Sequence, residues 1–64
     1  MRFIKVKGND RGKSIVVNAE DIEHILVNPE GITELHMKYE NETTFYVKES
    51  PDEIYSLILR STPL

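Results

Sequence analysis

The chain has 64 residues, with eight Lys and Arg, eleven Asp and Glu, no cysteine and a formal net charge of −3. A chain of this length forms one domain, and its core alone supplies only about 3–5 kcal/mol of stability. The lack of cysteine excludes disulfide bonds and thiolate metal sites. Association with another chain, most simply a second copy, remains as a way to add stability.

The charge is divided unevenly along the chain. Residues 1–13 carry five basic residues and one acidic residue, a balance of +4. Residues 14–64 carry three basic and ten acidic residues, a balance of −7, so that the two segments together give −3. A basic first hairpin on an acidic body is therefore the main electrostatic feature.

No targeting or membrane segment is recognisable. The first ten residues, MRFIKVKGND, contain no apolar run of the length found in signal peptides. No stretch approaches the roughly 18–20 apolar residues that span a membrane. We therefore expect a cytoplasmic protein with no membrane span.

The N-terminal third predicts a β-hairpin. FIKVK at 3–7 alternates, with Ile4 and Val6 on one face and lysines on the other. GNDRGK at 8–13 supplies turn residues, and SIVVN at 14–18 is a β-branched strand.

The next segment predicts a turn and a further strand. Asn18 is a good helix cap, but Pro29 and Gly31 follow too soon for a long helix. We expect a tight turn or a single helical turn after Asn18, then a strand at 23–28. NPEG at 28–31 has the residue pattern of a type I turn.

Two more strands follow. ITELHMKY at 32–39 alternates most regularly, and TTFYVKE at 43–49 places Phe45 and Val47 inward. ENE at 40–42 is expected to turn the chain between them.

These elements define the fold class. We predict a single domain, residues 1–64, of the α+β class and mainly β. About five antiparallel strands within residues 2–49 form a meander, open or curled toward a small barrel. One C-terminal helix follows at about residues 50–61.

The start of this helix is marked by a capping box. Ser50 is the N-cap, Pro51 occupies the first helical position, and Glu53 lies three residues after the cap. Ile54, Leu57 and Ile58 suffice to dock the helix, since a helix packed on a sheet needs an apolar arc of only roughly 100°.

Tyr55 and Leu59 widen the apolar arc to about 200° at the helical period. These two side chains either fold over the end of the sheet or face a second subunit. The small core favours the second alternative, so we predict a homo-oligomer in which Tyr55 and Leu59 contribute to the contact.

No motif for catalysis survives inspection. GNDRGKS at 8–14 lacks the glycine spacing of a phosphate loop and is followed by a strand instead of a helix. His24 and His36 are twelve residues apart and match no zinc spacing. We therefore expect a protein that is not an enzyme and that has no catalytic residues, no cofactor and no bound metal.

The basic hairpin provides an alternative function. Cations interleaved with an aromatic ring can follow a phosphate backbone and stack on a base. Exposed lysines on strands also serve to prevent aggregation, which competes with this interpretation. The candidate nucleic-acid contacts are Phe3, Lys5, Lys7, Arg11 and Lys13.

The segments VNAEDIEHI, ITELHM and VKESPDEIYSLI together resemble the small flagellar FlbD family, also called the swarming motility SwrD family. The resemblance covers residues 3 to 60 and implies a small bacterial accessory protein of flagellar or motility function, without catalytic residues. The matching positions are Asn18, Asp21, Ile22, Val47, Lys48, Glu49 and Ser50.

The most consistent interpretation is a small, non-enzymatic, cytoplasmic protein-interaction or assembly module. The alternative is a nucleic-acid-binding regulatory protein that uses the basic N-terminal hairpin.

Overall fold

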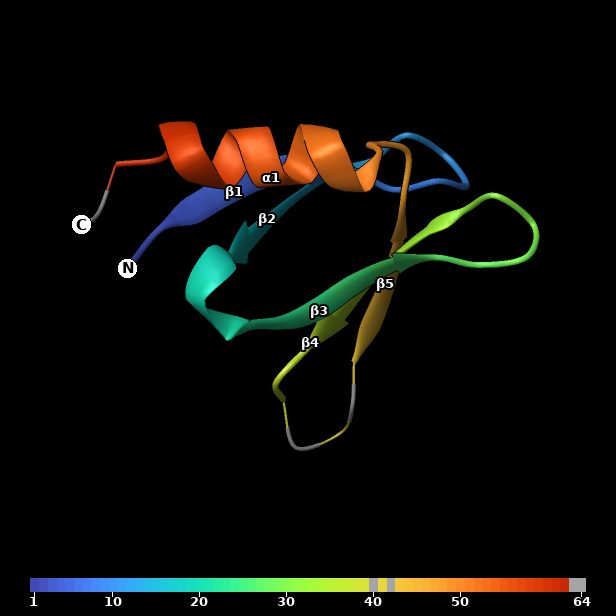
Figure 1. Cartoon of the computed structure of the whole chain (residues 1–64), viewed down its shortest axis with the longest axis horizontal. Coiled ribbons are helices and arrows are strands. Elements are labelled where there is room, and N and C mark those ends of the chain that lie inside the picture. Colours follow the sequence, from blue (N-terminus) through green and yellow to red (C-terminus); the bar gives the residue numbers. More distant parts are fainter. Residues whose placement is uncertain (40, 42, 63–64) are drawn as a thin grey trace.

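The computed structural model describes residues 1–39, 41 and 43–62, and it contains five antiparallel strands, one short 3-10 helix and one C-terminal helix (Figure 1). The predicted fold class is confirmed, and the described strands form two sheets that do not close into a barrel. In chain order the elements are β1 Phe3–Lys7, β2 Ser14–Asn18, η1 Ala19–Asp21, β3 Ile22–Val27, β4 Thr33–Met37, β5 Thr44–Val47 and α1 Pro51–Arg60.

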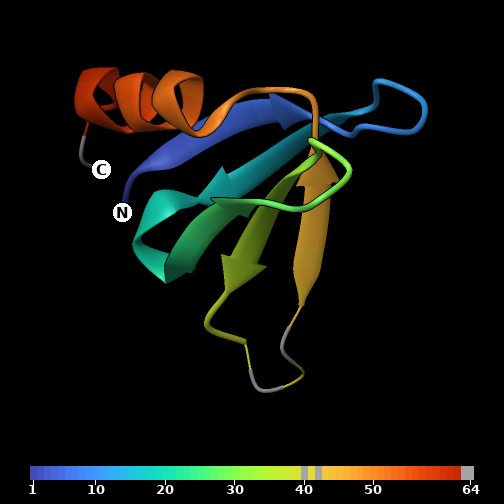
Figure 2. The ribbon, with the colours of Figure 1, turned by 45° about the vertical axis from the view of Figure 1, so that its right-hand side comes forward.

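The first sheet is the hairpin β1–β2, and the second has the strand order β3-β4-β5. Consecutive strands β2 and β3 are not paired, because η1 redirects the chain between them (Figures 1 and 2). The Asn18 side chain caps this turn by accepting a hydrogen bond from the backbone N–H of Glu20 at 3.1 Å. Of the two alternatives expected after Asn18, a tight turn or a single helical turn, the structure contains the helical turn.

The two sheets meet at one corner. Gly8, just after β1, forms an antiparallel bridge with Val47 at the end of β5. The backbone N–H of Lys48 donates to the carbonyl of Lys7 at 2.8 Å. This corner couples the hairpin to the second sheet and sends the chain from β5 into α1.

Strand β4 lies at the centre of the second sheet, and its alternation is confirmed. Thr33, Leu35 and Met37 are buried, whereas the residues between them are only half-buried. The turn expected at 40–42 includes positions 40 and 42, which lie outside the described residues.

Strand β3 contains an irregularity that the sequence does not reveal. Ile22 pairs with Met37 but His24 pairs with His36, so Glu23 is an extra residue in the ladder. Such a bulge shifts the side-chain alternation by one residue. The inward positions Ile22 and Ile25 are therefore three residues apart instead of two.

Helix α1 begins with the predicted capping box. The Ser50 hydroxyl accepts from the backbone N–H of Glu53 at 3.1 Å, and the Glu53 carboxylate accepts from the backbone N–H of Ser50 at 3.0 Å. Pro51 opens the helix, where its missing N–H costs nothing.

A single core lies between the two sheets and the helix. Helix α1 crosses over β1 and also contacts β3, with Leu57 and Ile58 packed at the border of the core (Figure 2). The buried apolar residues are Ile4, Val6, Val17, Leu35, Met37, Val47 and Ile54.

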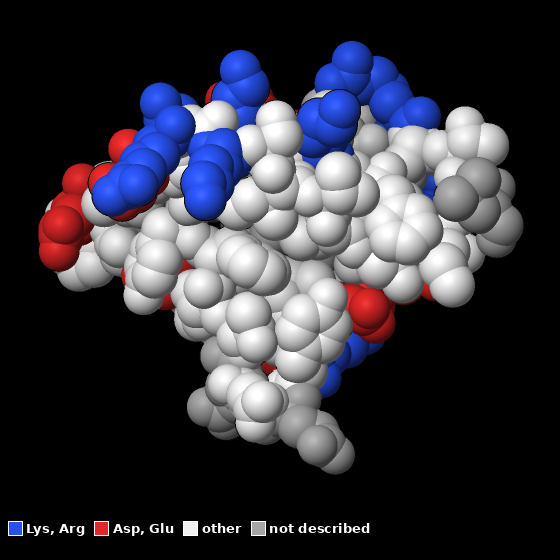
Figure 3. Space-filling model, turned by 180° about the vertical axis from the view of Figure 1, so that it is seen from behind, with Lys and Arg blue, Asp and Glu red and all other residues white. Residues whose placement is uncertain are grey.

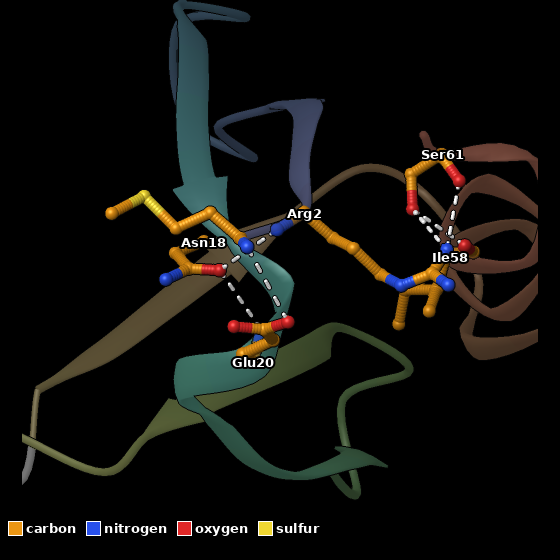
Figure 4. Close-up of polar contacts among 6 residues, drawn as sticks. Arg2, Asn18, Glu20, Ile58 and Ser61 are labelled. Atoms are coloured by element: carbon orange, nitrogen blue, oxygen red, sulfur yellow. Dashed lines mark hydrogen bonds and ion pairs between the residues drawn. The ribbon is translucent and has the colours of Figure 1, made fainter. Parts of the chain in front are cut away.

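A hydrogen bond connects Arg2, just before β1, with Ser61, just after α1 (Figure 4). The Arg2 guanidinium donates from Nη1 to the carbonyl oxygen of Ser61 at 2.8 Å. The Ser61 hydroxyl in turn donates to the carbonyl of Ile58 at 2.6 Å, which satisfies one of the last carbonyls of the helix. The segment before β1 thus holds the helix along the hairpin.

We predict that Ile54→Val lowers the free energy of unfolding by about 0.5–1.5 kcal/mol, because Ile54 is fully buried and the lost methylene leaves a cavity. Urea denaturation followed by circular dichroism measures this loss. Leu59→Ala, on the exposed side of the same helix, is the control and should change the stability of the dilute protein much less. Equal losses in the two variants would contradict the assigned orientation of α1.

Candidate interaction surfaces

One side of α1 is apolar and exposed. Tyr55 and Leu59 are 61% and 65% exposed, so they do not cover the end of the sheet. Asp52 lies on the same stripe, since positions i, i+3 and i+7 share one side of a helix. We call Asp52, Tyr55 and Leu59 the helix flank. The sequence analysis predicted Tyr55 and Leu59 as contact residues. Asp52 joins them because its side chain lies on the same side of the helix.

The basic residues of the first hairpin lie in two places. Phe3, Lys5 and Lys7 share the outer face of β1, and all three are exposed. Arg11 and Lys13 belong to the loop between β1 and β2. Figure 3 shows Lys and Arg side chains gathered along one edge of the molecule, above a broad surface that carries little charge.

Acidic side chains from the end of β5 and from α1 offset part of this positive charge. Lys5 shares a shallow hollow of about 280 Å³ with Glu49 and Glu53. The Glu49 carboxylate also accepts hydrogen bonds at 3.0 and 3.1 Å from the backbone N–H of Lys7. These two carboxylates therefore weaken the positive electrostatic potential along β1. The sequence around β1 does not indicate this, because Glu49 and Glu53 are distant in the chain.

The loop between β1 and β2 gains a cation from a distant part of the chain. The Lys48 ammonium lies over Gly12, only 3.5 Å from the position that a Cβ atom on this glycine would occupy. Gly12 has a φ of 67°, a conformation that favours glycine. Arg11, Lys13 and Lys48 thus form a cationic group around this loop, with Asp10 as its acidic neighbour.

A hollow of about 670 Å³ lies beside this loop. We call it the loop hollow. Its apolar wall comes from three separate elements of the chain, and Arg11 and Lys13 lie on its polar rim. The apolar residues are Ile15 of β2, Ile32 before β4, and Phe45 and Tyr46 of β5. No local pattern in the sequence indicates this site, because only the folded chain brings these residues together.

The outer face of the second sheet carries a polar cluster. The His24 and His36 rings stack with their centroids 4.4 Å apart. Nε2 of His36 lies 2.9 Å from Oε1 of Glu34, and the Thr44 hydroxyl lies 3.3 Å from Nδ1. His24 lies outside the core and is exposed.

Glu34 is the centre of this cluster. The hydrogen bond with His36 and a second one from the Asn28 amide, at 3.0 Å, hold the pKa of Glu34 below its ordinary value. Both donors favour the ionised carboxylate. Among the described residues, no group of three or more His, Cys, Asp or Glu side chains is arranged to hold a metal ion. Ring stacking and hydrogen bonds in this cluster connect side chains of β3, β4 and β5 on the outer face of the sheet.

The lowered pKa of Glu34 leads to a prediction of pH-dependent stability. A carboxyl whose pKa is lower in the folded than in the unfolded chain stabilises the fold above its unfolded pKa of about 4.3. This contribution is lost as the pH falls through the folded pKa. We predict that Glu34→Gln loses less stability than the wild type between about pH 5 and pH 3.

Urea midpoints across this pH range measure the difference. Glu30→Gln is the matched control, because the Glu30 side chain is exposed in the turn before β4 and should leave the acid dependence close to that of the wild type. The assignment fails if Glu34→Gln and the wild type lose stability in parallel.

In the part of the chain that the structure describes, no helix has the length and apolar character needed to cross a membrane. Comparisons with protein-family models, with curated proteins and with solved structures find no match. The resemblance to the flagellar family remains a prediction from the sequence.

Proposed function

We propose that the protein is a non-enzymatic interaction and assembly module that associates with itself through the helix flank. The observation that carries this proposal is the exposure of Tyr55 and Leu59 on a helix whose opposite side is fully occupied by the core. An aromatic and an aliphatic side chain held side by side on a rigid helix form a typical centre for a protein contact.

The energetics favour the same conclusion. Burial of a leucine-sized side chain contributes about 1.5–3 kcal/mol. A core of this size supplies about 3–5 kcal/mol by itself, and the chain has no disulfide to add to it. A contact that covers Tyr55 and Leu59 would therefore be a large addition to the stability of the protein.

The biological process is proposed from the sequence resemblance. A small cytoplasmic accessory protein of bacterial flagellar function would act by assembly and not by catalysis, which agrees with a module of this kind. Deletion of the gene in a flagellated host, followed by a swarming assay, tests this assignment. Normal swarming of the deletion strain would remove the flagellar proposal and leave the assembly proposal untouched.

We predict that the wild type sediments as an oligomer at micromolar concentration and that Leu59→Glu sediments as a 7.4 kDa monomer. The glutamate would place a charge in the apolar contact, where desolvation makes it costly. Tyr39→Glu is the control, because it adds the same charge at an exposed residue outside α1. A monomeric wild type would refute self-association, and an oligomeric Leu59→Glu would place the contact elsewhere.

Nucleic-acid binding is the second candidate function. The supporting observation is the row of basic side chains along one edge of the molecule (Figure 3). Phe3 is exposed on the same face of β1 as Lys5 and Lys7. Glu49 and Glu53 lie close to Lys5 and reduce the attraction for phosphate. We therefore rank this function below assembly.

If nucleic acid is the partner, mixed RNA or DNA should bind at low salt, and the affinity should fall steeply as salt rises. Lys5→Ala combined with Lys7→Ala should weaken binding and flatten the salt dependence, because two phosphate contacts are lost. Lys38→Ala, outside the basic hairpin, is the control. Fluorescence anisotropy with labelled oligonucleotides measures both quantities, and no binding at low salt would exclude this candidate.

A further inference from the structure

We propose that the helix flank of one copy docks into the loop hollow of a second copy, so that the protein associates head to tail. This inference rests on the proposed function and names the acceptor surface for the flank. Both surfaces are present in every copy, so each molecule can donate its flank and accept that of a neighbour.

The two surfaces match in polarity and in size. Tyr55 and Leu59 supply an apolar ridge, and the hollow presents an apolar wall that includes Ile15, Phe45 and Tyr46. The hollow has a volume of about 670 Å³ and is open to solvent, so side chains of a neighbouring molecule can reach its wall. Two side chains from a helix fit into a space of this kind.

The two surfaces also match in charge. The charged residues that line the hollow are Arg11, Lys13 and Asp10, so two cations face one carboxylate. The Lys48 ammonium, over Gly12, adds a further cation to the loop. The helix flank carries the carboxylate of Asp52 on the same stripe as Tyr55. Opposite charges at the border of an apolar contact fix its orientation and speed up the encounter.

The charge distribution along the chain favours a head-to-tail contact. The balance of +4 in residues 1–13 and −7 in residues 14–64 gives each molecule a basic loop and an acidic body. Contact between two identical basic loops would be repulsive. Contact between the basic loop of one copy and the acidic body of the next would be attractive.

The position of the two surfaces determines the type of assembly. The loop between β1 and β2 lies at one end of the molecule, and α1 runs from near this end toward the other (Figure 1). The helix flank extends along most of α1 and is a different surface from the loop hollow. Because the contact joins two different surfaces, it is heterologous and generates a ring or an open chain. A twofold dimer of helix against helix is the alternative that the test must separate.

The test is a mixing experiment with two variants. Leu59→Glu destroys the flank and keeps the hollow, and Tyr46→Glu places a charge in the hollow and keeps the flank. Each variant alone should sediment as a monomer. Their mixture should form a dimer of twice 7.4 kDa and nothing larger, because one intact flank meets one intact hollow.

The control is Tyr39→Glu, which changes an exposed residue outside both surfaces and should keep the wild-type oligomer. Far-ultraviolet circular dichroism verifies that every variant is folded. A mixture that remains monomeric overturns the proposal. A Tyr46→Glu variant that associates like the wild type also overturns it, and if Leu59→Glu is then monomeric, self-association through the helix flank still stands.

A second measurement covers the case in which a glutamate variant does not fold. The chain contains no cysteine, so single cysteines report one contact each. Leu59→Cys mixed with Tyr46→Cys should give mainly the mixed disulfide under mild oxidation. Preferential formation of the Leu59→Cys homodimer would instead show a twofold helix contact and overturn the head-to-tail arrangement.

Discussion

The structure depends on one small core that two separate sheets must share. Among the described residues, the bridge between Gly8 and Val47 joins the two sheets at one corner. Elsewhere the two sheets are held together by packing in the shared core and not by continuous strand pairing. Ile54 of α1, which is fully buried with Val6 and Leu35, holds the helix against both sheets. With no disulfide to assist, loss of this packing would separate the hairpin from the rest of the protein.

This constraint fixes the orientation of α1 and therefore the surface that it presents. The side of α1 that carries Ile54 and Ile58 packs against the core. The hydrogen bond from Arg2 to Ser61 holds the C-terminal end of the helix in this orientation. Tyr55 and Leu59 are left exposed as a consequence. The same corner that joins the sheets brings Lys48 over Gly12 and so gives the loop its added positive charge. Donor and acceptor surfaces thus arise from the requirements of one core.

Local patterns were sufficient for the elements but not for their assembly. The alternation over β4 and the capping box at Ser50 act within a few residues, and both were predicted correctly. The separation of β2 from β3 and the bulge at Glu23 depend on how strands are placed in space, so no short window reveals them. The loop hollow is the clearest example, because its wall joins Ile15 of β2 with Phe45 and Tyr46 of β5. Periodicity alone identified Tyr55 and Leu59 as widening the apolar arc of the helix, whereas their exposure depends on how α1 packs on the core.

The most direct test of the account is a dilution series of the ¹⁵N-labelled wild type followed by heteronuclear NMR. The amide signals of two distant regions should shift together as the concentration rises, namely α1 around Tyr55 and Leu59 and the wall around Ile15 and Tyr46. The outer face of the second sheet, at His24 and His36, should remain unchanged. Shifts confined to α1 would indicate a twofold helix contact, and a spectrum independent of concentration would contradict self-association.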